Sequence, residues 1–482
     1  MEQTRTKHLA FVFLSFSLLA YSRLGVCEDG NPKECSDKTV ISGMQFPTPE
    51  KRLLDYVVKA DRKAMREHEW EIFAGLIRQG GRPLWEDWDS KCEVKLSTVG
   101  CSAANKQLPP KGIRGLEFPV EMITHYLQDN KLNASGYEKL KADLGNGPVL
   151  ASVRFNPEAA CHLLKDHLTS PDVLEHLLGN RASVPVIPNF DSPSIALKLD
   201  WEFLEEQRGS NGTPKKYYLH VFDPVSLVPA APESGGSYSV LGAPKVEVVP
   251  NQKCLDRNYS GEPIPLSCFY SLEVTNLSLP TNGLVLHLGH QLLIGPGPHY
   301  VVLVGIHLTT REIPEWTWAT FYWSRRALDS ERMENQNRPP AIKGPWNHYS
   351  MLTTFNANLP PEPGTSGQPI CSSPYLEGGL SHGASSNCLF CHQLASFTGN
   401  RKPRDSEAIG SPPYTKGQRS DTSTMQRTFL ADSLSTDFLW SLADVDVNQE
   451  QKLLDQFELH LQSELKLHRL QKNPVLKENP MK

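Results

Sequence analysis

Short runs of apolar residues, many of them β-branched or aromatic, recur through the middle of the chain and are separated by Pro, Gly and Asn. Such runs, bounded by turn-forming residues, are typical of β-strands. The expected strands are Val149–Phe155, Ser194–Phe203, Tyr217–Phe222, Tyr238–Leu241, Lys245–Val249, Leu284–Ile294 and Tyr300–Thr309. One helix, predicted over Pro157–Leu178, interrupts them, and the aromatic run Trp316–Trp323 suits an extended segment or a short helix. We therefore expect a middle region rich in antiparallel sheet.

A different periodicity marks the two ends of the chain. From Pro49 to Leu76 apolar residues recur at intervals of three and four, which indicates a helical N-terminal part. Further helices are predicted over Pro119–Leu127 and over the tail Asn448–Gln471, where apolar residues share one stripe. The region from about Ala327 is otherwise rich in Pro, Gly and Ser, which favours loops. The expected fold class is α+β.

The first residues have the pattern of an export signal. Basic residues precede a short apolar stretch that ends near Tyr21, and small residues suit cleavage before Arg23. This stretch is shorter than a membrane-spanning helix, and no later segment is long and uncharged enough to span a bilayer. We predict a signal peptide over 1–22 and an exported chain without a transmembrane segment. Acylation at Cys27 would give a lipoprotein, but the bulky Val26 before it does not favour that.

Three regions are expected after the signal peptide: a helical region over 23–145, a β-rich region over 146–326 and a loop-rich region with a C-terminal helix over 327–482. The chain is mildly acidic, with 49 Lys and Arg against 54 Asp and Glu. Because no basic stripe is present, nucleic acid is not an expected partner.

Cysteine spacing suggests two short-range disulfides. Cys92 with Cys101, and Cys254 with Cys268, are each separated by few residues and could close surface loops, as is common in exported proteins. Spacing alone does not establish which cysteines pair.

Cys388, Cys391 and His392 form a Cys-x-x-Cys-His motif, the pattern through which haem c is covalently attached. Two thiols three positions apart can each add to one vinyl group of the same porphyrin, and the adjacent imidazole can bind the iron from the proximal side. We therefore expect one covalent haem c on Cys388 and Cys391, with His392 as the proximal ligand. On this interpretation, 327–482 is a haem c region.

Two other kinds of site are compatible with the motif. A zinc site would need a fourth ligand such as Cys371 or His382. A dithiol–disulfide site would need a buried strand before the motif, whereas Ser381–Asn387 is polar and contains Gly.

The distal side of the iron has fewer credible ligands. Met425 lies in a solvated, polar context that does not suit a buried thioether. Strand alternation places His299 and His307 on the same face as Val301 and Leu303, so a strand histidine could face the haem. We take His307 as the distal candidate, with His348 and His382 as alternatives, beside an open distal position.

Four segments together resemble a known family. They are Trp316–Ser324, Pro374–Glu377, Ser386–His392 and Thr436–Ser441. The resemblance, over roughly 283–444, is to largely uncharacterised exported bacterial cytochrome c family proteins with a single C-terminal haem c motif. It implies covalent haem and a periplasmic location, and the residues carried over are Cys388, Cys391 and His392.

The sequence therefore favours a periplasmic monohaem c-type cytochrome that transfers electrons to or from a redox partner protein or a small molecule. One alternative is a haem-dependent, peroxidase-like oxidoreductase with an open distal site. Another is a zinc or structural Cys-His site in a binding protein. Whether the chain is an enzyme is left open, as is its oligomeric state.

Overall fold

The computed structural model describes residues 38–78, 82–94, 149–180, 186–210, 213–224, 243, 245–260, 262–274, 298–356, 370–377, 387–399 and 433–443. The described residues from Thr39 onwards belong to one compact unit. Helices and antiparallel sheet combine in this unit, which confirms the predicted α+β class. In this part of the chain, no helix has the length and apolar character that crossing a membrane requires.

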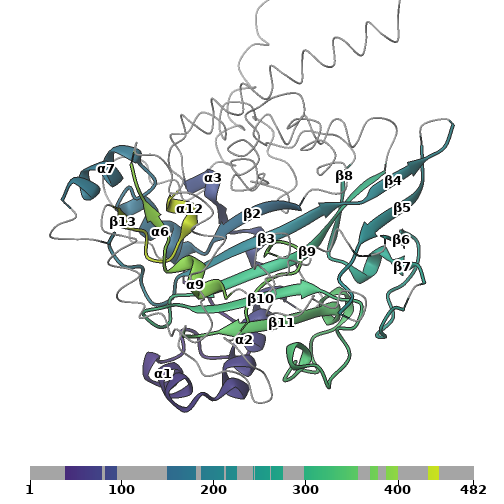
Figure 1. Cartoon of the computed structure of the whole chain (residues 1–482), viewed down its shortest axis with the longest axis horizontal. Helices are drawn as coiled ribbons and strands as arrows, with labels where there is room; N and C mark the ends of the chain where they lie inside the picture. Colours follow the sequence, from purple (N-terminus) through teal and green to yellow (C-terminus); the bar gives the residue numbers. More distant parts are fainter. Residues whose placement is uncertain are drawn as a thin grey trace, which may run out of the picture. The chain divides into compact units, whose positions relative to one another are not determined.

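A large sheet forms the centre of the described structure (Figure 1). Its strand order is β1-β2-β3-β9-β10-β11, with β8 pairing with β9, and all of these pairs are antiparallel. The strands are β1 (Asp89–Ser90), β2 (Val149–Phe155), β3 (Ile195–Phe203), β8 (Ser271–Val274), β9 (His299–Thr310), β10 (Thr317–Trp323) and β11 (Tyr349–Thr354). Strand β11, from the region beyond 326, therefore extends the sheet begun in the β-rich region.

Helix α2 (Arg62–Ile77) packs on one face of this sheet, and α1 (Glu50–Lys59) packs beside α2. Helix α1 ends at Ala60, which has a left-handed backbone, and α2 begins after Asp61, whose side chain accepts a hydrogen bond from the N–H of Ala64. An aspartate at this position satisfies a backbone donor that the first helical turn cannot. Helix α2 buries Phe73 against Phe321 of β10, with ring centroids 4.2 Å apart.

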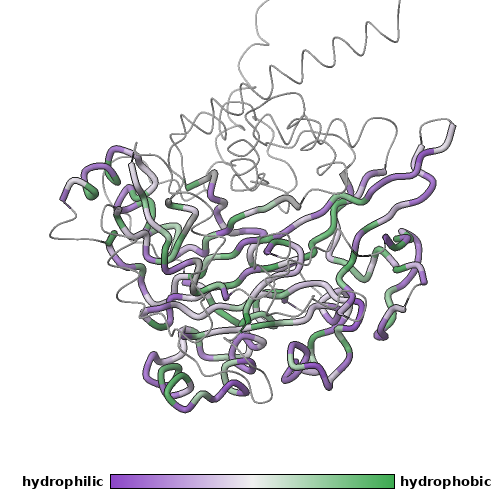
Figure 2. Tube along the Cα trace, in the orientation of Figure 1, coloured by the Kyte–Doolittle hydropathy of each residue, from purple (hydrophilic) through white to green (hydrophobic). Residues whose placement is uncertain are grey.

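The opposite face carries shorter elements. They are α3 (Lys91–Val94), α6 (Pro157–Lys165), α7 (Pro171–Gly179), α9 (Cys388–His392), α12 (Trp440–Ala443) and the small sheet of β12 (Ser396–Phe397) with β13 (Leu434–Ser435). Alternation along the strands separates the two faces: Ala196 and Trp318 pack with this second group, whereas Leu197 and Ala319 pack with the α2 side. Apolar side chains therefore pack on both faces of the main sheet. Figure 2 shows hydrophobic stretches, coloured green, along its strands.

A four-stranded sheet extends from the end of β3 in the described residues. Its strands are β4 (Glu205–Arg208), β5 (Pro214–His220), β6 (Lys245–Val249) and β7 (Ile264–Pro265), of which β6 and β7 are parallel. Short 3₁₀ turns complete the described elements: η1 (Leu84–Glu86), η5 (Leu266–Cys268), η6 (Met333–Asn335) and η7 (Gly344–His348).

Several predicted elements are present with small changes. Strands β2 and β6 have the predicted bounds, β3, β5 and β9 differ at their ends, and the aromatic run forms strand β10. The predicted helix over Pro157–Leu178 is two helices, because a turn with a left-handed His167 separates α6 from α7. The predictions for 1–22, Pro119–Leu127, Tyr238–Leu241, Leu284–Ile294 and Asn448–Gln471 lie outside the described residues.

A β-bulge in β9 corrects one prediction about side-chain direction. Asp200 pairs with Gly305, but the next residue, Trp201, pairs with Leu303. Since neighbours on β3 point to opposite faces and paired residues share a face, Gly305 and Leu303 lie on opposite faces. His307 follows the face of Gly305, so the prediction that it shares a face with Leu303 was wrong. The extra residue of the bulge reverses the alternation.

Candidate functional site

The motif begins a short helix that is fixed to a neighbouring segment. The side chain of Asn387 accepts a hydrogen bond from the N–H of Leu389, which caps the first turn of α9. The N–H of Cys388 donates to the carbonyl of Cys371 over 3.0 Å, and Cys371 and Asn387 form a parallel bridge. The backbone at 371 therefore positions the start of the Cys-x-x-Cys-His turn.

His392, at the end of α9, is held in one orientation. Its Nδ1 lies 2.7 Å from the carbonyl oxygen of Phe438, and its ring packs on Trp318 with centroids 4.3 Å apart. Because a carbonyl can only accept, Nδ1 is the donor, and Nε2 carries the lone pair in the neutral ring. Asp437 and Phe438 have left-handed backbones, and Asp437 accepts hydrogen bonds from the N–H of Phe190 and from Arg311.

Cys388 is buried at the other end of α9. Its Sγ lies 3.3 Å from Sγ of Cys371 and 3.0 Å from the Cys371 carbonyl oxygen. The hydrogen bond with Cys371 and burial raise the pKa of Cys388 well above its ordinary value, against an opposing effect of His307. The group is therefore a thiol at neutral pH rather than a ready nucleophile. The side chain of Cys391 lies outside those described.

His307 reaches the same place from β9. Its Nε2 lies 3.2 Å from Oδ2 of Asp200 and 3.8 Å from Oε1 of Glu377, and the ring also interacts with Cys388. Burial alone would lower the pKa of His307, but Glu377 and Asp200 together raise it well above its ordinary value. Burial raises the pKa of Glu377, and the charge of His307 opposes that rise. The arrangement favours an imidazolium beside the buried Asp200 and the partly buried Glu377.

The bulge makes room for this cluster. A side chain at Gly305 would place its Cβ 2.6 Å from Oδ2 of Asp200. Because glycine has no side chain, the Asp200 carboxylate can lie over Gly305 and reach His307 on the face that carries α9. Glu202 lies on β3, as Asp200 does, and burial together with the nearby Asp200 raises the pKa of Glu202 well above its ordinary value.

The structure therefore brings Cys388, His392 and His307 to one face of the sheet and adds residues that we did not predict. Asp200 and Glu377 surround His307, and Phe438 orients His392. One signal was available: Asp200 and Glu202 are acidic residues inside a run that otherwise reads as a buried strand. A contact such as that of Phe438 with His392 has no local signal in the sequence.

Of the other candidate histidines, the structure describes His299 and His348, and each has a partner outside the motif. His299 pairs with Glu206, with Nδ1 2.5 Å from Oε1, and His382 is outside the described residues. Nε2 of His348 is 3.1 Å from Sγ of Cys254. Cys254 is bonded to Cys268, which confirms that predicted disulfide. Cys254, Cys268 and His348 form the one group of possible metal ligands among the described side chains, but both sulfur atoms are already used in the disulfide.

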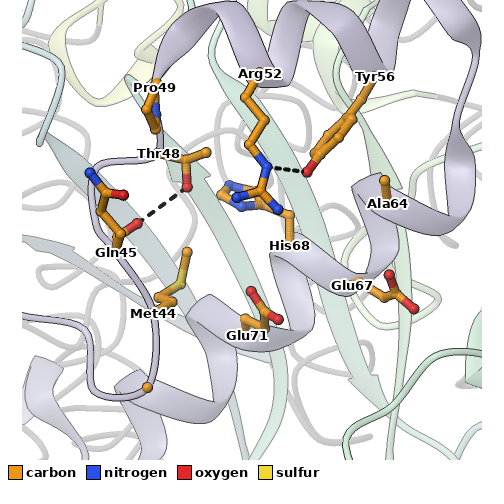
Figure 3. Close-up of a pocket in the computed structure, with 11 residues that line it drawn as sticks. Met44, Gln45, Thr48, Pro49, Arg52, Tyr56, Ala64, Glu67, His68 and Glu71 are labelled. Carbon is orange, nitrogen blue, oxygen red and sulfur yellow. Dashed lines mark hydrogen bonds between the residues drawn. The ribbon is translucent and has the colours of Figure 1, made fainter.

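A pocket of about 280 Å³ lies between α1 and α2, on the α2 side of the sheet (Figure 3). Polar side chains line it, including Arg52, whose Nε donates to the hydroxyl of Tyr56 over 2.6 Å. His68 at its base is 2.9 Å from Oε2 of Glu312. Because α9 lies on the other face, this pocket is separate from the motif.

No protein-family model matches this chain, and no curated protein or solved structure matches it.

Proposed function

We propose that the chain is a periplasmic monohaem c-type cytochrome in which Cys388 and Cys391 hold the haem and His392 is the proximal ligand. The observation that carries the proposal is the contact between Nδ1 of His392 and the carbonyl of Phe438, 2.7 Å apart. Iron-binding histidines generally donate their other ring N–H to a carbonyl or carboxylate, which fixes the tautomer and orientation of the ring. His392 meets that requirement directly after the second cysteine of the motif.

The residues around His392 fit a haem to different degrees. Trp318 supplies an apolar surface beside His392, which suits a macrocycle that must exclude water. Cys388 has the right position in the chain, but its Sγ faces Cys371 and would have to turn away from it to form a thioether. When bound, haem c supplies one-electron redox chemistry. The protein's part is then to hold the group and to limit its access to solvent.

An electron relay is the form of the proposal that we favour, with a redox partner protein or a small molecule as donor or acceptor. Distal ligation by His307 stays a prediction. The contacts with Asp200 and Glu377 favour its protonated form, which has no lone pair for iron, so ligation would require loss of that proton. An open distal position would instead favour a peroxidase-like oxidoreductase.

The deciding experiment is to produce the full chain in a periplasm that contains a haem c maturation system and to measure its intact mass after denaturation. We expect the mass of the polypeptide plus one haem. An unmodified polypeptide mass would refute the proposal, and zinc found with that unmodified chain would support a structural Cys-His site.

The role of His392 is tested by His392→Ala beside the matched control His176→Ala, since His176 is exposed on α7. We expect both variants to retain covalent haem, and only His392→Ala to change the absorbance spectrum of the iron. An unchanged spectrum in His392→Ala would mean that another residue binds the iron.

A further inference from the structure

Two buried thiols lie side by side where the motif begins. The described free cysteines are Cys371, with no exposed surface, and Cys388, which is 9% exposed. Their sulfur atoms are 3.3 Å apart, and the N–H of Cys388 donates to the carbonyl of Cys371. A disulfide needs about 2 Å between its sulfur atoms, so the two side chains would have to turn towards each other to form one.

The segment that carries Cys371 is anchored, so this proximity belongs to the fold. The Cys371 thiol lies 3.6 Å from the carbonyl oxygen of Leu352 on β11. The Tyr375 hydroxyl donates to the carbonyl of Trp323 and accepts from the N–H of Phe222. The N–H of Ser373 donates to the carboxylate of Glu377. The main sheet therefore positions Cys371 independently of α9.

We propose that Cys371 and Cys388 form a disulfide in the haem-free chain, and that this bond keeps Cys388 from reacting with haem. The oxidant is a low-molecular-weight or protein disulfide. Two S–H bonds break, one S–S bond forms between Cys371 and Cys388, and the external disulfide takes both electrons and both protons as two thiols. Cys254–Cys268 and the disulfide-bonded Cys161 show that other thiols of this chain are oxidised.

Burial makes the timing of this reaction important. Since exchange requires an accessible thiolate, the buried thiol of Cys388 reacts slowly in the folded chain, and a bond formed during folding is protected from reductants. The competition with haem rests on the proposed function, because a thioether uses the same sulfur atom. Pairing with Cys371 and attachment of haem at Cys388 therefore exclude each other.

The pairing is tested on the full chain made in an oxidising compartment without a haem supply. Thiols are alkylated during unfolding, and the unreduced chain is cleaved after Glu and after Phe. Cleavage after Glu377 separates Cys371 from the motif, and cleavage after Phe390 separates Cys388 from Cys391. We expect a linked pair of peptides that contain Cys371 and Cys388, and its loss on reduction. Alkylation of both residues without reduction, or a bond from Cys388 to another cysteine, would overturn the proposal.

The competition is tested by Cys371→Ser in the haem-competent periplasm, with the adjacent buried Ser372→Ala as matched control. We expect a larger fraction of haem-bearing chains in Cys371→Ser than in wild type and the control. An equal fraction would remove the competition. Haem-free mass in all three proteins would refute the proposed function, while the linked peptides would still report the disulfide. The wild-type peptide map needs no variant to fold.

Discussion

His307 and its neighbours form a largely buried set of charges whose balance depends on the proton of the imidazole. Asp200 and Glu377 face the ring from β3 and from the segment after Cys371, and Cys388 faces it from α9. Removing one member of such a group leaves the others without a partner in a place that water does not easily reach. The cluster therefore links the protonation of His307 to the stability of the fold.

We predict that Glu377→Gln weakens the pH dependence of stability. Because the folded-state pKa of His307 is raised, its favourable contribution is complete below the unfolded pKa of about 6.5 and is lost as pH rises through the folded value. The wild-type free energy of unfolding should fall across this window, by up to about 1.4 kcal/mol per pH unit for one proton. Without Glu377 the folded pKa moves back towards 6.5, so the fall becomes smaller.

Urea unfolding at a series of pH values from about 6.5, the ordinary pKa of histidine, up to about 9 measures this slope. The matched control is Glu247→Gln, which removes a carboxylate that pairs with Lys216 at the surface. Equal slopes in wild type and Glu377→Gln would show that Glu377 does not hold the proton on His307.

At the scale of elements, the bulge of β9 decides which side chains reach the site. It turns His307 and Gly305 to the face that carries α9, and it leaves Leu303 on the face that carries α2. A glycine is required at the bulge by the close approach of Asp200. The strand thus supplies both the histidine and the space for its partner.

We predict that Gly305→Ala destabilises the protein by about 1–3 kcal/mol, the usual cost of forcing extra atoms into a packed interior. The added Cβ would meet Oδ2 of Asp200 at 2.6 Å and displace the carboxylate from His307. The matched control is Gly179→Ala at the end of α7, where a Cβ meets nothing within 4 Å. Urea denaturation compares the two, and equal midpoints would contradict the role of Gly305.

The strands show how far local pattern can be trusted. The bounds of β2 and β6 follow from apolar runs between turn residues, because edges and turns are local features. The bulge in β9 could not be foreseen, since the inserted residue, Val304, is apolar and leaves the apolar run of β9 unbroken. The aromatic run of β10 has apolar residues at consecutive positions, so its pattern suited a strand and a helix equally. Its pairing with β9 and β11 decides for the strand.

At the scale of the whole molecule, the main sheet separates two apolar layers. Trp70 and Phe73 of α2 pack on one face, and Trp318, Cys388 and Leu389 pack on the other. The strands between them are buried from both sides. A change in the α2 layer should therefore alter stability without altering the surroundings of His392.

We predict that Phe73→Ala lowers the free energy of unfolding by about 3–5 kcal/mol, since it removes a fully buried ring stacked on Phe321. If the chain binds haem as proposed, the fraction of folded chains that carry it should not change, because His392 lies across the sheet. The control Val58→Ala, at a side chain 84% exposed, should shift stability by no more than about 0.5 kcal/mol. Loss of haem attachment in folded Phe73→Ala would show that the two layers are coupled.

Part of the candidate site could be predicted from the sequence and part could not. The motif at Cys388–His392 is contiguous, so its residues and its helical turn could be predicted. Cys371, Asp200 and Phe438 join it through contacts between segments far apart in the chain. Such contacts depend on how the strands are ordered in the sheet, and no local pattern encodes that order.

The order of the strands along the chain also affects when each part of the site is synthesised. Phe203 of β3 pairs with Val301 of β9, although a long stretch of chain separates them, and β10 and β11 follow β9 in the chain. Long-range pairings of this kind are slow to form. A chain that leaves its site of synthesis from the N-terminal end delivers Cys388 after every described strand of the main sheet. The Cys388–His392 turn therefore emerges after these strands, and it packs on a sheet whose strands have already left the site of synthesis.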